Sequence, residues 1–263
     1  MLRCLRSCLV AAFLVVGLGA CGGPSQLSDG SMTGRPAVDG SVEEWGGRLT
    51  PVDGPSVSAA ALPTDSLLYV ALLVQDRALV RSLAVNGLVL WVDPSGGERR
   101  AYGVQYPLGL RRQRAGQRAS GGTQQQDGVG LSDVSLSELE VVRGDSARQR
   151  IPARFSSGLR SKATLDPSAL IYEVAIPVGD GASSRRHGLR TALSGTVGLG
   201  LEIPEREEED ETRVGGGQNI GSVTGRRGRR RRRRRQRRRR QRASGPQFET
   251  LDLWMTVPAE TGR

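Results

Sequence analysis

The feature that most constrains the fold of this chain is a series of short apolar runs that end at turn-forming residues. The run Leu67–Val74 is apolar on both faces, and Leu88–Val92 and Leu170–Ile176 repeat the pattern. Such runs, bounded by Asp, Asn, Gly and Pro, are typical of strands buried between two layers, because an amphipathic helix needs a longer periodic stretch. The pattern predicts an all-β protein.

Weaker strand patterns complete this prediction. Glu138–Val142 reads as a short strand, whereas Arg77–Leu83 has apolar residues at helical spacing and is expected to form one or two helical turns. We therefore expect one antiparallel β-sandwich, jelly-roll-like, over residues 38–258. Its remaining strands are predicted at Val57–Leu62, Tyr102–Pro107, Thr196–Pro204 and Phe248–Val257.

Two segments have a composition that gives a core almost nothing to bury. Residues 109–130 are rich in Arg, Gln, Gly and Ser, and residues 205–246 join an acidic block to a run of arginines. Such blocks repel themselves and stay solvated, so both are expected to be disordered loop insertions. Loop-closure entropy rises only with the logarithm of length, so long insertions cost the sandwich little stability.

The first twenty residues have the pattern of an export signal. Arg3 and Arg6 precede an apolar stretch, Leu9–Leu18, that is too short to cross a membrane. The end of this stretch, Leu18-Gly19-Ala20-Cys21, resembles a bacterial lipobox, which implies lipidation of Cys21; an ordinary signal peptide is the alternative. We expect residues 1–20 to be removed, residues 21–36 to be a flexible tether, and Gly22 to direct the lipoprotein to the outer membrane.

The charge of the chain is concentrated in one tract. The formal net charge is +11, and fourteen arginines lie between Arg226 and Arg242. Without these and the two arginines of the leader, the remainder is near −5, so the sandwich itself is mildly acidic. The arginines we expect to contact a polyanion, such as an anionic polysaccharide, are Arg226, Arg227, Arg229, Arg230 and Arg231.

No base-reading module accompanies this tract. Aromatic side chains that would stack on bases do not interleave the arginines, which argues against nucleic acid as the partner. The tract could instead pair with the acidic block of the same loop, or serve no specific role.

Catalytic and metal-binding residue types are scarce. His187 is the only histidine, and it lies beside Arg185 and Arg186 without a nucleophile elbow nearby. Cys21 is the only cysteine expected after the leader is removed, which excludes disulfides. We therefore predict a non-catalytic protein without a cofactor. Calcium is the one metal considered, at aspartates that equally suit turn caps: Asp65, Asp76 and Asp93.

The few aromatic residues are predicted to be mainly structural. Trp45 follows the turn Asp39-Gly40 and is expected to pack against the sandwich, while Trp91 and Trp254 lie in apolar strands and are expected in the core. Tyr102 and Tyr106 alternate with Val104 and so share one face of a strand. They are the candidate ligand-binding residues, as an exposed aromatic platform.

The combination of these motifs resembles a family 9-like carbohydrate-binding module. The matching elements are Asp39-Gly40 before Trp45, the strand that ends at Asp93, and the segment Tyr172-Glu173-Val174-Ala175-Ile176-Pro177. The resemblance covers residues 38–106 and 170–257. It implies a non-catalytic β-sandwich that binds saccharides, in which two tryptophans clamp the sugar.

The same resemblance implies that the clamp is missing here. No aromatic residue lies between Tyr69 and Trp91, and the loop before Phe248 carries arginines where the second tryptophan belongs. A polar contact residue of the family is replaced by Val89. The sequence therefore predicts the fold and, as its function, an envelope lipoprotein that binds a glycan. The alternative is a structural envelope protein whose Arg-rich loop contacts anionic polymers.

Overall fold

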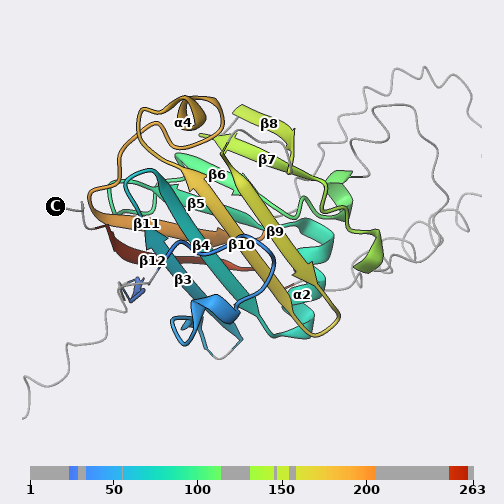
Figure 1. Ribbon diagram of the computed structural model, residues 1–263. Helices are drawn as coiled ribbons and strands as arrows, with labels where there is room; N and C mark the ends of the chain where they lie inside the picture. Colours follow the sequence, from blue (N-terminus) through green and yellow to red (C-terminus); the bar gives the residue numbers. More distant parts are fainter. Residues whose placement is uncertain are drawn as a thin grey trace, which may run out of the picture.

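The protein is a sandwich of two β-sheets, seen as two layers in the computed structural model (Figure 1). The structure describes residues 24–28, 34–54, 56–113, 131–144, 147–153, 158–204 and 249–259. The all-β prediction is confirmed: apart from short helical segments, the described elements are strands. Within the described residues, no helix is long and apolar enough to span a membrane.

Sheet A has seven strands in the order β1-β12-β11-β5-β6-β7-β8. All of its pairs are antiparallel except β1 with β12. Its strands are β1 (Ser25–Gln26), β5 (Val89–Asp93), β6 (Tyr102–Gln105), β7 (Glu138–Arg143), β8 (Ala147–Pro152), β11 (Gly195–Glu202) and β12 (Asp252–Ala259).

Sheet B has five antiparallel strands in the order β2-β3-β4-β10-β9. The two long apolar runs of the sequence, β4 and β10, pair along their whole length at its centre. Its strands are β2 (Thr50–Asp53), β3 (Val57–Pro63), β4 (Leu67–Val74), β9 (Arg160–Leu165) and β10 (Leu170–Pro177).

The core fills the space between the sheets with alternate residues of each strand. Val70 and Val174 of sheet B belong to the same buried cluster as Leu90, Val104 and Leu199 of sheet A. Because successive residues of a strand point to opposite faces, the neighbours of these side chains point outward. Each sheet therefore also has an outer face, and the two outer faces differ.

A helix closes one end of the core. α2 (Arg77–Asn86) begins at Asp76, whose carboxylate accepts hydrogen bonds from the amides of Ala78 and Leu79, both at 2.8 Å. Leu79, Val80 and Leu83 are buried in the main core. The helix ends at Gly87, with φ of 88°, where a Cβ atom would lie 2.7 Å from the Pro107 carbonyl oxygen. A second short helix, α4 (Ala182–Arg186), lies near the other end of the sandwich.

Two of the predicted segment assignments are corrected by described residues. Ser25 and Gln26, expected in a flexible tether, pair with Met255 and Thr256, because the edge of sheet A offers them backbone partners. The proposed disordered insertion at 109–130 begins too early, since Leu110 is buried against α2 and Val134. The other predicted insertion, residues 205–246, lies outside the described residues.

Candidate functional site

The outer face of sheet A carries an aromatic centre. The strand register places Trp91 of β5 opposite Gly103 of β6 and Gly200 of β11, and Gly200 in turn lies opposite Trp254 of β12. Trp91 and Trp254 pack together with Val89 and Val142 in a cluster separate from the main core. Both tryptophans therefore lie on the outer face, outside the core between the sheets. Trp91 is buried there, whereas Trp254 is only partly buried, so the predicted core position is wrong for Trp254.

Each of these two rings lies over a glycine. A Cβ atom at Gly103 would lie 2.7 Å from Cε3 of Trp91, and one at Gly200 would lie 2.8 Å from Cζ2 of Trp254. The missing side chains thus leave room for the rings to lie close against the strands. Trp91 is 6% exposed, whereas Trp254 is half-buried, so Trp254 is the more accessible ring.

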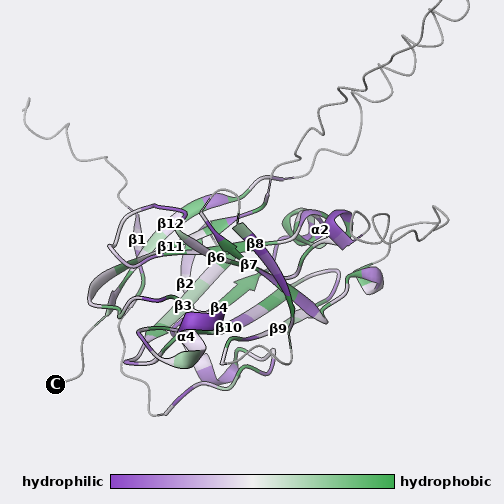
Figure 2. Ribbon diagram, turned by 90° about the horizontal axis from the view of Figure 1, so that it is seen from above, coloured by the Kyte–Doolittle hydropathy of each residue, from purple (hydrophilic) through white to green (hydrophobic). Residues whose placement is uncertain are grey.

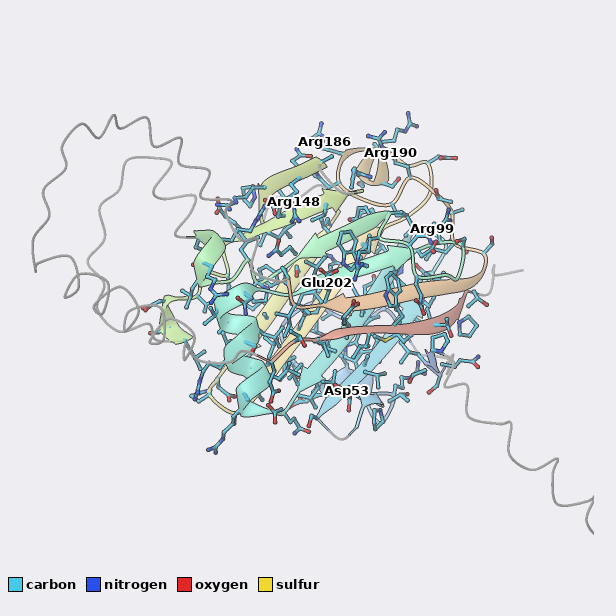
Figure 3. All side chains as sticks on the ribbon, turned by 180° about the vertical axis from the view of Figure 1, so that it is seen from behind. Asp53, Arg99, Arg148, Arg186, Arg190 and Glu202 are labelled. Carbon is cyan, nitrogen blue, oxygen red and sulfur yellow. The ribbon has the colours of Figure 1, made fainter. Side chains whose placement is uncertain are left out.

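Charged groups adjoin the rings on one side. The Trp91 Nε1–H donates to Oε2 of Glu202 at 2.7 Å, and the same oxygen lies 2.7 Å from Nε of Arg100. Arg100 also reaches Asp252, with 2.9 Å between Nη2 and Oδ2. Burial lowers the pKa of Arg100, but the carboxylates of Glu202 and Asp252 outweigh this and raise it above its ordinary value. Figure 3 shows Glu202 from this side of the molecule.

A second ion-paired group lies further along the same face. Oε2 of Glu140, on β7, is 2.8 Å from Nη2 of Arg112 and 3.4 Å from Nη1 of Arg148. Arg148 also donates to the side-chain oxygen of Gln105 at 3.4 Å. Glu140 and Gln105 are buried, so this group supports the sheet edge and leaves the arginines as its accessible part.

The outer face of sheet B has the opposite character. Trp45, in the short 3-10 helix Glu43–Trp45, is 2% exposed and packs on Ala60, Tyr69 and Ala175. Its Nε1–H donates to Oε1 of Glu173 at 2.8 Å. The predicted structural role of Trp45 is therefore confirmed.

The buried Glu173 fixes the turn that precedes Trp45. Its Oε2 accepts hydrogen bonds from the amides of Gly40 at 2.7 Å and Asp39 at 3.0 Å. The carboxylates of Asp39, Glu44 and Glu173 come within 4.8 Å of one another, which is a spacing a metal ion could use. Both oxygens of Glu173 already accept protein N–H groups, so its placement has a structural explanation without a metal.

The aspartates considered for calcium act as caps. Asp93, at the end of β5, is fully buried and accepts hydrogen bonds from Ser95 and Arg99. Burial disfavours its charged form, but these hydrogen bonds outweigh that effect and hold its pKa well below the ordinary value. Asp76 caps α2, and Asp65 is exposed in a turn. For Asp76 and Asp93, the turn-cap interpretation fits the hydrogen bonds.

The tyrosine platform is corrected by the structure. Tyr102 and Tyr106 do share a face, but it is the inner one, and each is 1% exposed. The Tyr102 hydroxyl donates to the His187 carbonyl at 2.7 Å and the Tyr106 hydroxyl to the Leu136 carbonyl at 3.1 Å. Their polar tips find buried partners, which permits a tyrosine to sit in the core.

The other predicted site residues lie outside the described residues. These are the lipidation site and the arginines expected to contact a polyanion: Cys21, Arg226, Arg227, Arg229, Arg230 and Arg231.

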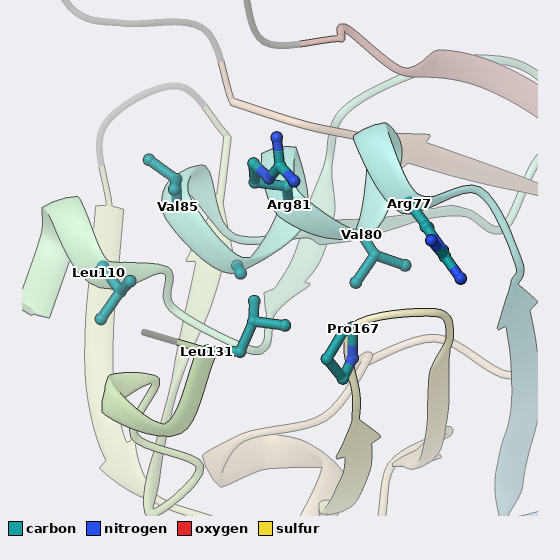
Figure 4. Close-up of a pocket in the computed structure, with 8 residues that line it drawn as sticks. Arg77, Val80, Arg81, Val85, Leu110, Leu131 and Pro167 are labelled. Atoms are coloured by element: carbon teal, nitrogen blue, oxygen red, sulfur yellow. The ribbon is translucent and has the colours of Figure 1, made fainter. Parts of the chain in front are cut away.

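A pocket of about 210 Å³ lies beside α2 (Figure 4). Val80, Ala84 and Leu131 line it together with Pro167, from the turn between β9 and β10, and Arg77 lies at one side. No aromatic side chain is among its lining residues, so within the described chain it offers no stacking surface for a sugar. The aromatic face of sheet A is the better candidate.

This face is hard to predict from the sequence because its residues are far apart in the chain. A local signal was available: Gly198 and Gly200 alternate with apolar residues in β11, and glycines inside a strand often mark close approach by another group. The Trp254 ring approaches Gly200, and the Gly97 carbonyl group approaches Gly198.

Two packed sheets, one of them with an aromatic cluster on its outer face, define the class of protein as a β-sandwich. No family model matches the sequence, and no curated protein matches it either. Among solved structures, a carbohydrate-binding module of family 9 from Caldicellulosiruptor kristjanssonii, in complex with glucose, is similar at 14% identity and a TM-score of 0.33. The match covers 71% of this chain and 80% of that one.

A second structure shares the same general likeness. It is a proposed carbohydrate-binding protein from Bacteroides uniformis, similar at 11% identity and a TM-score of 0.30, over 56% of this chain and 62% of that one. At these TM-scores the likeness does not identify which residues of this chain bind a ligand.

Proposed function

We propose that this chain is a non-catalytic binding protein that holds a neutral saccharide on the outer face of sheet A. The observation that carries the proposal is the pair Trp91 and Trp254, each lying over a glycine, with Glu202 and Arg100 beside them. Sugars present C–H groups on the faces of their rings and hydroxyls at the edge. An indole with adjacent carboxylate and guanidinium groups matches both parts of such a ligand.

The side chains that are exposed on this face are the ones expected to contact the sugar. Trp254 is half-buried, and the side chains of Arg100 and Asp252 are 45% and 58% exposed. We expect the ring of Trp254 to stack on the sugar and the Arg100–Asp252 pair to bind hydroxyls. Trp91, which is largely buried, positions Glu202 through its indole N–H.

A binding role fits these groups better than catalysis. Arg100 contacts the carboxylates of both Glu202 and Asp252, so these groups hold a guanidinium rather than flank an open reaction site. His187, the only histidine of the chain, is 8% exposed. Burial lowers the pKa of its imidazole, and repulsion by Arg186 and Arg143 lowers this pKa further. A general base needs access to its substrate.

The experiment is a glycan array followed by calorimetry with the saccharides that bind. Trp254→Ala is expected to weaken binding by about 1–3 kcal/mol, by analogy with aromatic stacking on the faces of other rings. Arg81→Ala, on α2 and away from this face, is the matched surface control and should bind as the wild type does. Equal affinities of wild type and Trp254→Ala would contradict the proposed face.

The array also separates this function from the alternative. Binding to neutral sugars that survives deletion of residues 205–246 supports the saccharide site. Binding to acidic polymers alone, lost on that deletion and in moderate salt, would instead support a structural protein whose Arg-rich loop contacts anionic polymers.

The same proposal places the protein in the cell envelope, anchored through a lipid on Cys21. The support is the sequence pattern Leu18-Gly19-Ala20-Cys21. Cells labelled with palmitate should incorporate label into the wild type and none into Cys21→Ser, with outer-membrane fractions containing the wild type. Label that persists in Cys21→Ser would contradict the anchor and leave the saccharide site untouched.

A further inference from the structure

The loop from Pro177 to Thr191 makes one end of the sandwich strongly basic. It contains Arg185, Arg186 and Arg190 but a single acidic residue, Asp180. Figure 3 shows Arg186 and Arg190 at this end of the molecule, and Figure 2 shows hydrophilic colour on α4 and the nearby β8. Arg143, at the end of β7, reaches the same loop and donates from Nη2 to the Gly188 carbonyl oxygen at 2.9 Å.

Hydrogen bonds within the loop hold this basic end in one shape. The Ser184 hydroxyl donates to the Gly179 carbonyl oxygen, and the Leu189 amide donates to the Pro177 carbonyl oxygen at 2.8 Å. Gly188 packs so tightly that a Cβ atom would lie 2.2 Å from the same Pro177 oxygen. The arginines therefore project from a fixed backbone, which reduces the entropy lost when they bind a ligand.

Arg185 and Arg190 donate hydrogen bonds to neutral acceptors. Nε of Arg185 donates to the Asp180 carbonyl oxygen at 2.9 Å. Nε of Arg190 donates to the Arg185 carbonyl oxygen at 3.2 Å. Among the described residues, the ion pairs within 4.0 Å do not include Arg143, Arg185 or Arg190. Carbonyl groups position an arginine but leave its positive charge in place.

The positive charge of these arginines affects two neighbouring groups. Burial lowers the pKa of Arg143, and repulsion by Arg190 lowers it further, while Tyr102 opposes the shift. Burial also lowers the pKa of His187, and the charges of Arg186 and Arg143 add to this effect. The Nδ1 atom of His187 is buried and has no hydrogen-bond partner among the described residues. Burial first, and the positive charges of the arginines second, thus disfavour the protonated form of this imidazole.

We infer that this end of the sandwich, defined here as the basic end by Arg143, Arg185, Arg186 and Arg190, binds the carboxylate or phosphate groups of an acidic polysaccharide. Guanidinium groups bind such oxyanions in a planar, two-pronged manner. An anion would pair with Arg143, Arg185 and Arg190, which have no carboxylate within 4.0 Å among the described residues. The site uses none of the residues of the proposed saccharide face, so an experiment can disprove either site without affecting the other.

Two observations favour a polysaccharide over nucleic acid or a membrane. The aromatic ring nearest the basic end, Tyr102, is buried with the Arg143 guanidinium 5.3 Å from its centroid, so it has no face free to stack on a base. Leu189, the one large aliphatic side chain between Ala182 and Arg190, is buried and cannot insert into lipid. The exposed part of the described basic end is charged, which suits a hydrated acidic polymer.

His187 gives a local readout for this site. It is the only histidine of the chain, so its imidazole signal in NMR of the untagged full chain is unambiguous. The groups that face or contact it are Arg186 on α4, Arg143 on β7 and Tyr102 on β6. Polygalacturonate is expected to shift the His187 signal and raise its pKa, because bound carboxylates offset the repulsion by the arginines. Dextran, the neutral control, should leave both unchanged.

A charge-matched pair of variants locates the effect. The double variant Arg185→Gln, Arg190→Gln should need about a five-fold higher polygalacturonate concentration to reach the midpoint, at half of the full shift of the His187 signal. The reason is that each exposed charge pair contributes about 0.2–1 kcal/mol to binding. Arg77→Gln with Arg81→Gln removes the same charge at the α2 end and should leave the midpoint unchanged. Circular dichroism establishes that both variants are folded.

Three outcomes would overturn the inference. The first is saturating polygalacturonate binding with no change at His187, which would place the polymer elsewhere, for example on the arginine tract. The second is an equal midpoint shift in both double variants. The third is a His187 response to phosphatidylglycerol vesicles but none to polygalacturonate, which would assign the basic end to a lipid surface.

Discussion

The two outer faces of the sandwich contain the same chemical pair in different surroundings. On sheet B, the Trp45 indole donates to Glu173 at 2.8 Å; on sheet A, the Trp91 indole donates to Glu202 at 2.7 Å. Backbone amides of the turn before Trp45 cover the remaining oxygen of Glu173, whereas Glu202 meets the half-exposed Arg100. The pair on sheet B is thus enclosed by backbone, whereas the pair on sheet A borders charged side chains that are 45% and 58% exposed, Arg100 and Asp252.

The largest test of this comparison is removal of the covered indole. Trp45→Ala is expected to lower the free energy of unfolding by about 3–5 kcal/mol, because it leaves a cavity and removes the donor to Oε1 of the buried Glu173 carboxylate. Trp254→Ala, on the open face, should cost about 1 kcal/mol. Urea unfolding followed by circular dichroism measures both. Equal losses of stability would mean that the two faces do not differ as described.

The carboxylates should follow the same order. In the wild type, both oxygens of Glu173 accept hydrogen bonds from N–H groups. Glu173→Gln replaces one of these oxygens with an N–H₂ group that cannot accept them, and is expected to cost about 1–3 kcal/mol of stability. Glu202→Gln should cost less than about 1 kcal/mol, since its partner Arg100 remains in contact with water. The same urea experiment compares them. A larger loss for Glu202→Gln would reverse the proposed roles of the two glutamates.

A glycine substitution tests the open face through binding. Gly200→Ala places a methyl group 2.8 Å from the Trp254 ring, so the ring must move and saccharide affinity is expected to fall by about 1 kcal/mol. Gly181→Ala is the matched control, because the nearest atom to its Cβ lies 3.8 Å away. Calorimetry with the best saccharide of the array measures both. Unchanged affinity in Gly200→Ala would show that the ring position does not matter.

The smallest expected effect concerns acid stability at Asp93. Its folded-state pKa lies below the ordinary value of about 3.9, so the stabilisation it provides is present above that pH and is lost as pH falls through the lowered pKa. Asp93→Asn should therefore lose less stability than the wild type when acidified below about pH 4. Thermal unfolding at a series of pH values measures the slope. Identical slopes in the two proteins would contradict the cap.

How far the sequence predicts this structure depends on whether a strand is stabilised locally or by its neighbours. β4 and β10 are predictable from the sequence because both faces of each strand are largely buried and, apart from Glu173, mainly apolar. The edge strands β8 and β9 were missed, since β8 exposes most of its side chains and forms a strand through pairing with β7. Ser25–Gln26 likewise depends on a partner near the other end of the chain.

The candidate site was harder to predict than the fold. Both Trp91 and Trp254 lie in apolar strands, and periodicity alone cannot say which alternate face meets the core when both are hydrophobic. Their proximity depends on β5, β11 and β12 lying side by side in register. The tyrosines were misplaced for the same reason: Tyr102 and Tyr106 share a face, but the pattern does not say that the shared face is the inner one.

The most direct test of the central claim follows the indole N–H signals of the three tryptophans during a saccharide titration. The probe is the neutral oligosaccharide that scores highest on the glycan array, added to ¹⁵N-labelled protein. We expect the signals of Trp91 and Trp254 to shift and saturate together, while the signal of Trp45 stays in place. Saturable binding that moves the Trp45 signal alone, or none of the three, would contradict a saccharide site on the outer face of sheet A.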